Sequence, residues 1–284
     1  MVDAIDAGIL WEYRLSRAVI AICCGSALAV SGVVLQSLLR NVLVDPYILG
    51  ISAGASAGAV AVAIIGIGAG AVSMSFGAFA GSLLAFAVVL LLSRFTGHII
   101  LAGIASAQLF HALSALMITK SANAEAARGI MFWLLGNLSG IRWEDARLAV
   151  PVAVIGLVVA LYHARALDAF TFGAESAQSL GIPVARVRLI LIFVTAMLTA
   201  VMVSMVGSIG FVGLVIPHAA RFLVGVRHAV LIPVAALMGA VFLVLCDVLS
   251  RIVIPGQVLP IGVVTALIGA PAFAVILIRG ARNR

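Results

Sequence analysis

Three polar side chains, Gln108, His111 and Ser114, recur at three-residue spacing within residues 95–119, a stretch without any Asp, Glu, Lys or Arg. In a helix this spacing places them along one face. Polar groups in such a stretch either line a water-filled cavity or form hydrogen bonds to a neighbouring helix. We predict a solute path along this face, and helix–helix hydrogen bonding remains the alternative. A lone histidine is weak evidence for a haem-iron ligand.

The sequence lacks the motifs of the common catalytic and metal sites. It contains no G-x-x-x-x-G-K-[ST] phosphate loop, and its one lysine, Lys120, follows a threonine. It contains no H-E-x-x-H, and Cys23, Cys24 and Cys246 form no C-x-x-C pair. We therefore predict that the chain is not an enzyme and holds no metal or cofactor. The energy for any transport would come from a partner protein or an ion gradient.

The rest of the chain must hold these side chains in a membrane. Of the 284 residues, 64% are hydrophobic and 10% are charged, against about 45–50% and about 25% in soluble domains. Residues 18–39, 47–93 and 189–220 contain no Asp, Glu, Lys or Arg. A helix needs roughly 20 apolar residues to cross a bilayer core, and backbone groups there must be paired internally. The chain is predicted to be an all-α, polytopic membrane bundle.

About nine membrane-spanning helices are expected in a single transmembrane domain, residues 1–284. Its first part (18–163) and second part (188–280) flank a cytoplasmic segment (164–187). The apolar piece 130–138 is too short to span, and we expect an interfacial helix there. The predicted spans are residues 18–39, 46–65, 75–93, 99–119, 148–163, 188–206, 210–224, 229–250 and 258–279.

Charge asymmetry between the connecting segments predicts the orientation. If the C-terminus lies in the cytoplasm, most of the 17 Lys and Arg side chains fall inside and most acidic side chains fall outside. The N-terminus then lies outside. The chain is predicted to cross the membrane many times. The basic side chains are scattered between apolar stretches, so no nucleic-acid partner is expected.

Five motifs follow one another in a fixed order along the chain. They are R-N-V-L-V-D-P (40–46), L-A-G-I-A (101–105), F-W-L-L-G-N-L-S-G (132–140), G-F-V-G-L-V-I-P-H (210–218) and L-P-I-G-V-V-T-A-L-I-G-A-P (259–271), with R-L-S-R (14–17) and Gln36 upstream. This set resembles the motifs of the FecCD family, permeases of iron–siderophore, haem and vitamin B12 ABC importers, in the same order, and the resemblance covers residues 11–280. Members commonly have ten spans, and the helix that precedes their R-L-P-R segment has no counterpart here. Ser16 and Val42 also replace the usual prolines.

The resemblance implies a multi-pass protein of the bacterial cytoplasmic (inner) membrane. It also implies a homodimer in the lipid bilayer, a cytoplasmic ABC ATPase dimer beneath it, and a periplasmic substrate-binding protein on top. Arg14 and Arg17 match the family's docking arginines, and Arg251 occupies a plausible third docking position. The predicted topology independently places all three outside. Membrane anchoring at the headgroup level is the alternative for Arg14 and Arg17. Asp247, four residues before Arg251, is expected to compete for that guanidinium.

The resemblance also implies a contact with the ATPase. Residues 166–172 and 174–180 are expected to form two short helices that seat in the ATPase. A plain solvated connector is the alternative. The residues that match the family's G-E-x-A-x-x-L-G pattern are Gly173, Glu175, Ser176, Leu180 and Gly181.

The expected function is the transmembrane permease subunit of an ABC importer. The resemblance implies a metal-chelate substrate, most commonly an iron–siderophore complex, with haem or cobalamin as further possibilities. An ion-coupled secondary transporter is the alternative function. Such a transporter would need carboxylates near the bilayer midplane, whereas Asp247, the one acidic residue within a predicted span, lies near its outer end. The sequence does not name the chelate.

Overall fold

A computed structural model describes residues 8–66, 72–120 and 124–282, and within these ranges all regular structure is helical. Six helices are long and apolar enough to cross a membrane, and three shorter apolar helices accompany them. Each of the nine predicted spans overlaps one of these nine helices. The predicted polytopic helical bundle is therefore confirmed.

The elements follow one another without long connections. They are η1 (Leu10–Leu15), α2 (Ser16–Leu38), η2 (Pro46–Leu49), α3 (Ile51–Val60), η3 (Ala61–Ile65), α4 (Met74–Thr96), α5 (Ile99–Lys120), α6 (Ala124–Leu134), α7 (Trp143–Tyr162), α8 (Ala164–Phe170), α9 (Ala174–Ser179), α10 (Val184–Val206), α11 (Val212–Val224), α12 (His228–Ile252) and α13 (Ile261–Arg282).

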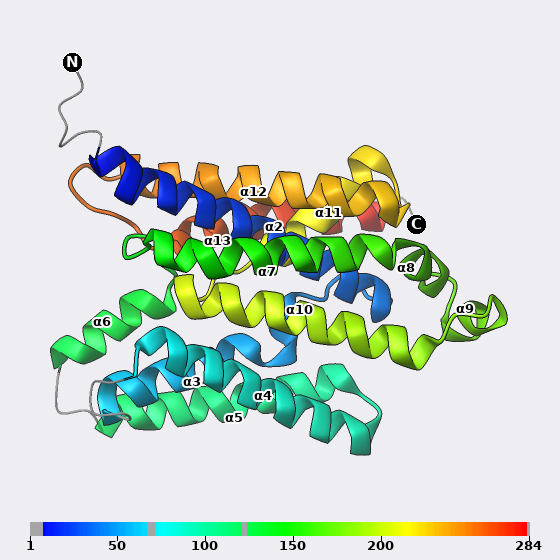
Figure 1. Ribbon diagram of the computed structural model, residues 1–284, viewed down its shortest axis with the longest axis horizontal. Helices are drawn as coiled ribbons and strands as arrows, with labels where there is room; N and C mark the ends of the chain where they lie inside the picture. Colours follow the sequence, from blue (N-terminus) through cyan, green and yellow to red (C-terminus); the bar gives the residue numbers. More distant parts are fainter. Residues whose placement is uncertain (1–7, 67–71, 121–123, 283–284) are drawn as a thin grey trace.

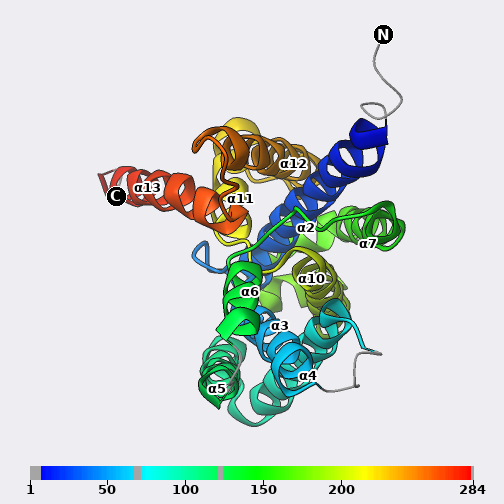
Figure 2. The ribbon, with the colours of Figure 1, turned by 90° about the vertical axis from the view of Figure 1, so that its left-hand side faces the viewer.

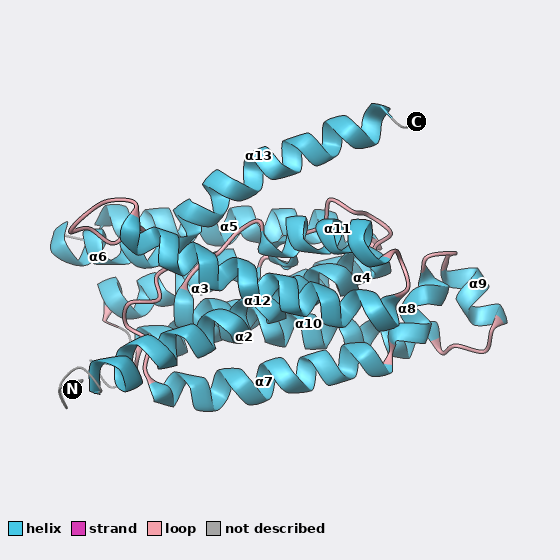
Figure 3. Ribbon diagram, turned by 90° about the horizontal axis from the view of Figure 1, so that it is seen from above, coloured by secondary structure: helices cyan, strands magenta, loops and turns pink. Residues whose placement is uncertain are grey.

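Helix α2 forms the centre of the bundle, and most of its side chains are buried. It packs against α7, α10, α11 and α12, so helices from the two halves of the sequence surround it. Helices α3, α4 and α5 form a second group beside α10 (Figure 2). Helix α13 contacts α11 and α12 and then extends away from the bundle (Figure 3).

Glycine pairs allow the central helices to touch along their backbones. A Cβ atom at Gly32 in α2 would overlap the carbonyl oxygen of Gly213 in α11. Gly25 in α2 and Gly239 in α12 are in the same situation, because a Cβ on either one would overlap the other's carbonyl oxygen. Small residues are favoured at helix contacts in membranes because they permit this approach.

Two predicted boundaries are wrong for local reasons. Helix α7 begins at Trp143, earlier than the predicted residue 148, because the Asp145 carboxylate accepts the Arg142 backbone N–H at 2.9 Å and caps the first turn. The expected interfacial helix at 130–138 is α6, Ala124–Leu134. It ends before Gly136, whose φ of +80° stops a right-handed helix.

The two ends of the bundle carry different segments. Helices α8 and α9 lie at the end where the chain's C-terminus is drawn, and the start of α2 lies at the opposite end together with α6 (Figure 1). We name the first the inner end and the second the outer end, after the orientation predicted from charge asymmetry.

Candidate functional site

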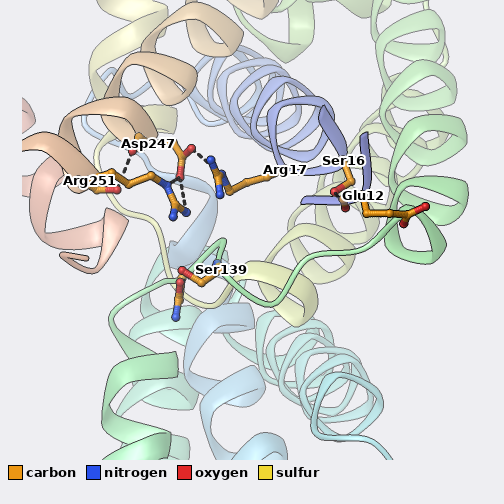
Figure 4. Close-up of polar contacts among 8 residues, drawn as sticks. Glu12, Ser16, Arg17, Ser139, Asp247 and Arg251 are labelled. Carbon is orange, nitrogen blue, oxygen red and sulfur yellow. Dashed lines mark hydrogen bonds and ion pairs between the residues drawn. The ribbon is translucent and has the colours of Figure 1, made fainter. Parts of the chain in front are cut away.

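At the outer end, one carboxylate binds two of the three predicted docking arginines (Figure 4). Arg17 Nε in α2 donates to Asp247 Oδ2 in α12 at 2.9 Å. Arg251, one turn further along α12, donates to Asp247 Oδ1 from Nη2 at 3.2 Å and from Nε at 3.3 Å. The predicted competition of Asp247 for Arg251 is confirmed. The bond from Arg17 joins residues 230 positions apart, so no local pattern in the sequence predicts it.

The three arginines differ in how far they are available to a partner. The Arg17 and Arg251 side chains are only 18% and 24% exposed. Arg14 is exposed and lies beside Leu10 and Leu15 on an apolar surface. Of the three arginines, Arg14 is therefore the most accessible from outside the chain.

An aromatic contact fixes the start of α2 at the outer end. The rings of Trp11 and Trp143 lie 5.3 Å apart, and Trp143 Nε1 donates to the Trp11 carbonyl oxygen at 3.0 Å. The contact joins η1 to the first turn of α7. It holds the segment that carries Arg14 against the bundle.

At the inner end, the predicted coupling segment forms the two short helices α8 and α9. Gly173, with φ +111°, is the N-cap residue immediately before α9, and Gly181, with φ +78°, follows its end. Both angles lie in the left-handed region that glycine adopts without strain. The Ser176 hydroxyl donates to the Phe172 carbonyl oxygen at 3.1 Å.

Helix α9 projects beyond the ends of the neighbouring helices (Figures 1 and 3). Glu175 and Ser176 are exposed, and the Leu180 and Phe172 side chains are 72% and 79% exposed. Ala177 is fully buried and faces the bundle. The helix is thus anchored through Ala177, and two large exposed apolar side chains, Phe172 and Leu180, flank its two ends.

A chain of polar contacts connects this segment with the central helices. The Asp168 carboxylate in α8 accepts the backbone N–H of His228 at 2.9 Å and its ring Nδ1–H at 2.6 Å. His228 Nε2 lies 2.5 Å from the hydroxyl of Ser37 in α2. His228 is 1% exposed, so its side chain extends the polar contacts of the coupling segment into the packed interior.

A second buried contact lies one residue earlier in α2. Gln36 is 2% exposed, and its Nε2 lies 3.2 Å from the Val44 carbonyl oxygen and 3.3 Å from that of Gly213. Its Oε1 accepts Arg221 Nη1 at 2.6 Å. Gln36 therefore ties α2 to α11 and to the loop before η2. In the sequence, Gln36 stands out only as part of a motif.

The predicted polar stripe on α5 is not a single face. Gln108 and His111 are exposed, whereas Ser114 is 6% exposed and donates to the Phe110 carbonyl oxygen at 2.8 Å. Six residues advance a helix by about 600°, so Ser114 points about 120° away from Gln108. The expectation that Ser114 shares their face is wrong.

Within residues 8–66, 72–120 and 124–282, no three His, Cys, Asp or Glu side chains are grouped so that they could hold a metal ion. In this part of the chain the three cysteines are buried and unpaired.

Comparisons with known proteins agree with this architecture. The model of the FecCD transport family matches residues 1–279. The cobalamin import system permease protein BtuC of Halobacterium salinarum is 41% identical over 274 residues, which cover 95% of this chain and 73% of that protein. The Fe(3+) dicitrate transport system permease protein FecD of Escherichia coli is 36% identical over 274 residues, covering 95% and 85%.

A solved structure described as an inward-facing conformation of a metal-chelate type ABC transporter superimposes with a TM-score of 0.89 at 33% identity. The match covers 98% of this chain and 90% of that one. The family match and the six helices that are long and apolar enough to cross a membrane both indicate a membrane transport protein. The chain is a multi-pass permease of the cytoplasmic membrane and belongs to the FecCD transport family.

Proposed function

We propose that this chain is the transmembrane subunit of an ABC importer that moves a metal chelate inward. A separate cytoplasmic ATPase supplies the energy, and a periplasmic binding protein delivers the substrate. The single observation that carries the proposal is helix α9, which projects from the inner end with Phe172 and Leu180 uncovered. Two large apolar side chains in water are costly, and a cleft of the ATPase would cover them.

Two exposed polar side chains support a homodimer. Gln108 and His111 lie on α5, a helix long and apolar enough to span the membrane. Polar groups in a span avoid lipid and face protein or water. A second copy placed against α5 would cover this face and leave a polar passage between the protomers. Ser114 is not part of that passage, because it is buried within one chain.

The extended helix α13 favours the same assembly. Leu267 and Ile278 are 69% and 58% exposed, and beyond its first turns α13 diverges from the bundle (Figure 3). An isolated span gains little from lipid alone, because lipid tails are as apolar as its own side chains. A second protomer would give α13 a packing partner.

The cluster at the outer end would receive the binding protein. Arg14 is exposed there, and Arg17 and Arg251 hold part of their surface beside it. Charge pairs at such a rim mainly steer the encounter and set its salt dependence. We assign Arg14 the largest contribution, because Asp247 already engages the other two.

The proposed cargo is an iron chelate, with an iron–siderophore complex as the first candidate and haem as a further possibility. Cobalamin is the second candidate, because the permease at 41% identity is named for cobalamin import. These cargoes are bulky complexes. The binding protein that docks on this permease would select among them.

Transport in proteoliposomes tests the proposal. The chain is reconstituted with its ATPase and binding protein, and uptake of a labelled iron–siderophore complex and of cobalamin is measured. Uptake should require ATP hydrolysis and should persist in the presence of a protonophore. Uptake that continues without the ATPase and stops with the protonophore would instead identify an ion-coupled secondary transporter.

A further inference from the structure

A cavity of about 580 Å³ opens at the inner end between the end of α7, the start of α8 and the start of α10. It is separate from the polar chain that joins Asp168 to Ser37, and neither of those residues lines it. Its walls include Tyr162, His163, Arg165, Arg186 and Ile190.

The cavity carries positive charge without a compensating carboxylate. Arg165 and Arg186 line it from two different helices, and no Asp or Glu is among the residues that line it. Both guanidinium groups are therefore available to an anionic ligand that enters the cavity. Arginine donates in a planar fork that suits phosphate oxygens.

The start of α10 contributes to the same wall. Helix α10 begins at Val184 after Pro183, and Pro183 provides no side-chain cap for the first turn. Pro183, Arg186 and Val187 all line the cavity. The uncapped N–H groups and the dipole of a 23-residue helix favour a negative group at this position.

The remaining walls suit acyl chains. Ile182, Val187 and Ile190 line the cavity, and Ile190 continues into the apolar span of α10. Tyr162, 83% exposed at the end of α7, is an aromatic side chain of the type found at headgroup level. The site thus combines two parts at the ends of α7 and α10. Arg165, Arg186 and the start of α10 form a part that suits an anion, and Val187 and Ile190 form an apolar part further along α10.

We propose that this cavity binds the headgroup of an anionic phospholipid of the inner leaflet. The phosphate lies between Arg165 and Arg186 at the start of α10, and the acyl chains run along Val187 and Ile190. Helix α8 leads directly into α9. A lipid bound here supports the base of the segment that we assign to the ATPase contact.

Native mass spectrometry of the full chain in detergent tests the site, with phosphatidylglycerol and phosphatidylcholine of identical acyl chains as probes. Arg165→Gln combined with Arg186→Gln should weaken phosphatidylglycerol binding about 10- to 30-fold, at about fivefold per arginine near a membrane surface. Phosphatidylcholine binding should not change. If the double variant does not fold, each single variant should show about fivefold weaker binding.

Arg188→Gln is the matched control, because Arg188 lies at the same end of α10 and is exposed but does not line the cavity. It should change binding by less than about twofold, because Arg188 does not line the cavity and its exposed charge is screened by solvent. Equal losses in control and double variant, or no preference of the wild-type chain for phosphatidylglycerol, would overturn the proposal. Displacement of the lipid by millimolar inorganic phosphate would also overturn it, since the site would then take free phosphate.

Discussion

Arg17 lies eight residues before Gly25 in α2, and Asp247, which accepts its hydrogen bond, lies eight residues after Gly239 in α12. Gly25 and Gly239 touch backbone to backbone in two antiparallel helices. Eight residues are about 12 Å along each axis, so the two side chains lie level. The ion pair at the outer end therefore depends on the glycine contact deeper in the bundle.

Asp247→Asn should lower the free energy of unfolding by about 1–3 kcal/mol, because Arg17 and Arg251 lose their shared charged acceptor. Unfolding in mixed micelles with increasing sodium dodecyl sulfate, followed by circular dichroism, measures the change. Glu12→Gln is the control at the same end, and it should have little effect because Glu12 is exposed. An Asp247→Asn protein as stable as wild type would show that the ion pair contributes nothing.

Gly239→Ala should destabilise the protein by about 1–3 kcal/mol or more, because the added methyl group overlaps the Gly25 carbonyl oxygen. The same unfolding assay applies. Gly129→Ala in α6 is the matched control, since nothing lies within 4 Å of a Cβ there. In the Gly239→Ala background, Asp247→Asn should also cost less than it does alone, because α2 and α12 are already separated. Strictly additive losses would contradict the link between the two contacts.

Leu180→Arg should weaken association with the ATPase while leaving the unfolding transition unchanged. Leu180 is 72% exposed, so the substitution disturbs no internal packing, but a partner cleft would have to bury the new charge. Co-purification with the ATPase measures the effect. Ala185→Arg, exposed at the same end on α10, is the control. If both variants retain the ATPase equally, α9 is a solvated connector.

His228→Ala should reduce transport per ATP hydrolysed while the ATPase stays bound. Without the ring, Asp168 in α8 and Ser37 in α2 lose their connection, although α9 keeps its exposed surface. Loss of a hydrogen bond to a charged group costs about 1.5–3 kcal/mol. ATPase activity and uptake measured in the same proteoliposomes give the ratio. His98→Ala is the control, because His98 is exposed before α5. An unchanged ratio for His228→Ala would show that the Asp168–His228–Ser37 contacts do not couple ATP hydrolysis to transport.

The sequence predicted the helices well because their signal is local. A charge-free span in lipid can pair its backbone N–H and C=O groups within the segment only as a helix, and every predicted stretch contains a helix. The start of α7 was missed because residues 142–147, four of which are charged, resemble a loop. In the structure, Asp145 uses its charge to cap the helix that it begins.

Contacts between distant helices were harder to predict. Asp247 was paired correctly with Arg251, because four residues on one helix fix that geometry. Its bond to Arg17 depends on how α2 and α12 are aligned, which in turn depends on Gly25 and Gly239. Ser114 was misplaced because a spacing of six residues was treated as one face. Its burial depends on the side of α5 that packs against the bundle.

Arg14→Glu should weaken docking of the binding protein without destabilising the fold, whereas changes at Arg17 or Arg251 should do both. Arg14 is exposed, so its reversal changes the charge of the surface without breaking an internal pair. Arg17→Glu would place a carboxylate beside Asp247 and destabilise the fold. The double reversal of Arg14 and Arg17 should abolish docking but combine both effects. Surface plasmon resonance with the binding protein, at low and high salt, separates the loss of surface charge, which depends on salt, from the destabilisation of the fold.

The loss for Arg14→Glu should appear mainly in the association rate and should shrink as salt rises, because an exposed rim charge acts through long-range attraction. Arg142→Glu is the control, since Arg142 is exposed at the same end but is not one of the predicted docking residues. ATPase association should remain intact in both variants, because α9 lies at the opposite end of the bundle (Figure 1). Docking that is unaffected at low salt would show that Arg14 serves only as an anchor at the membrane surface.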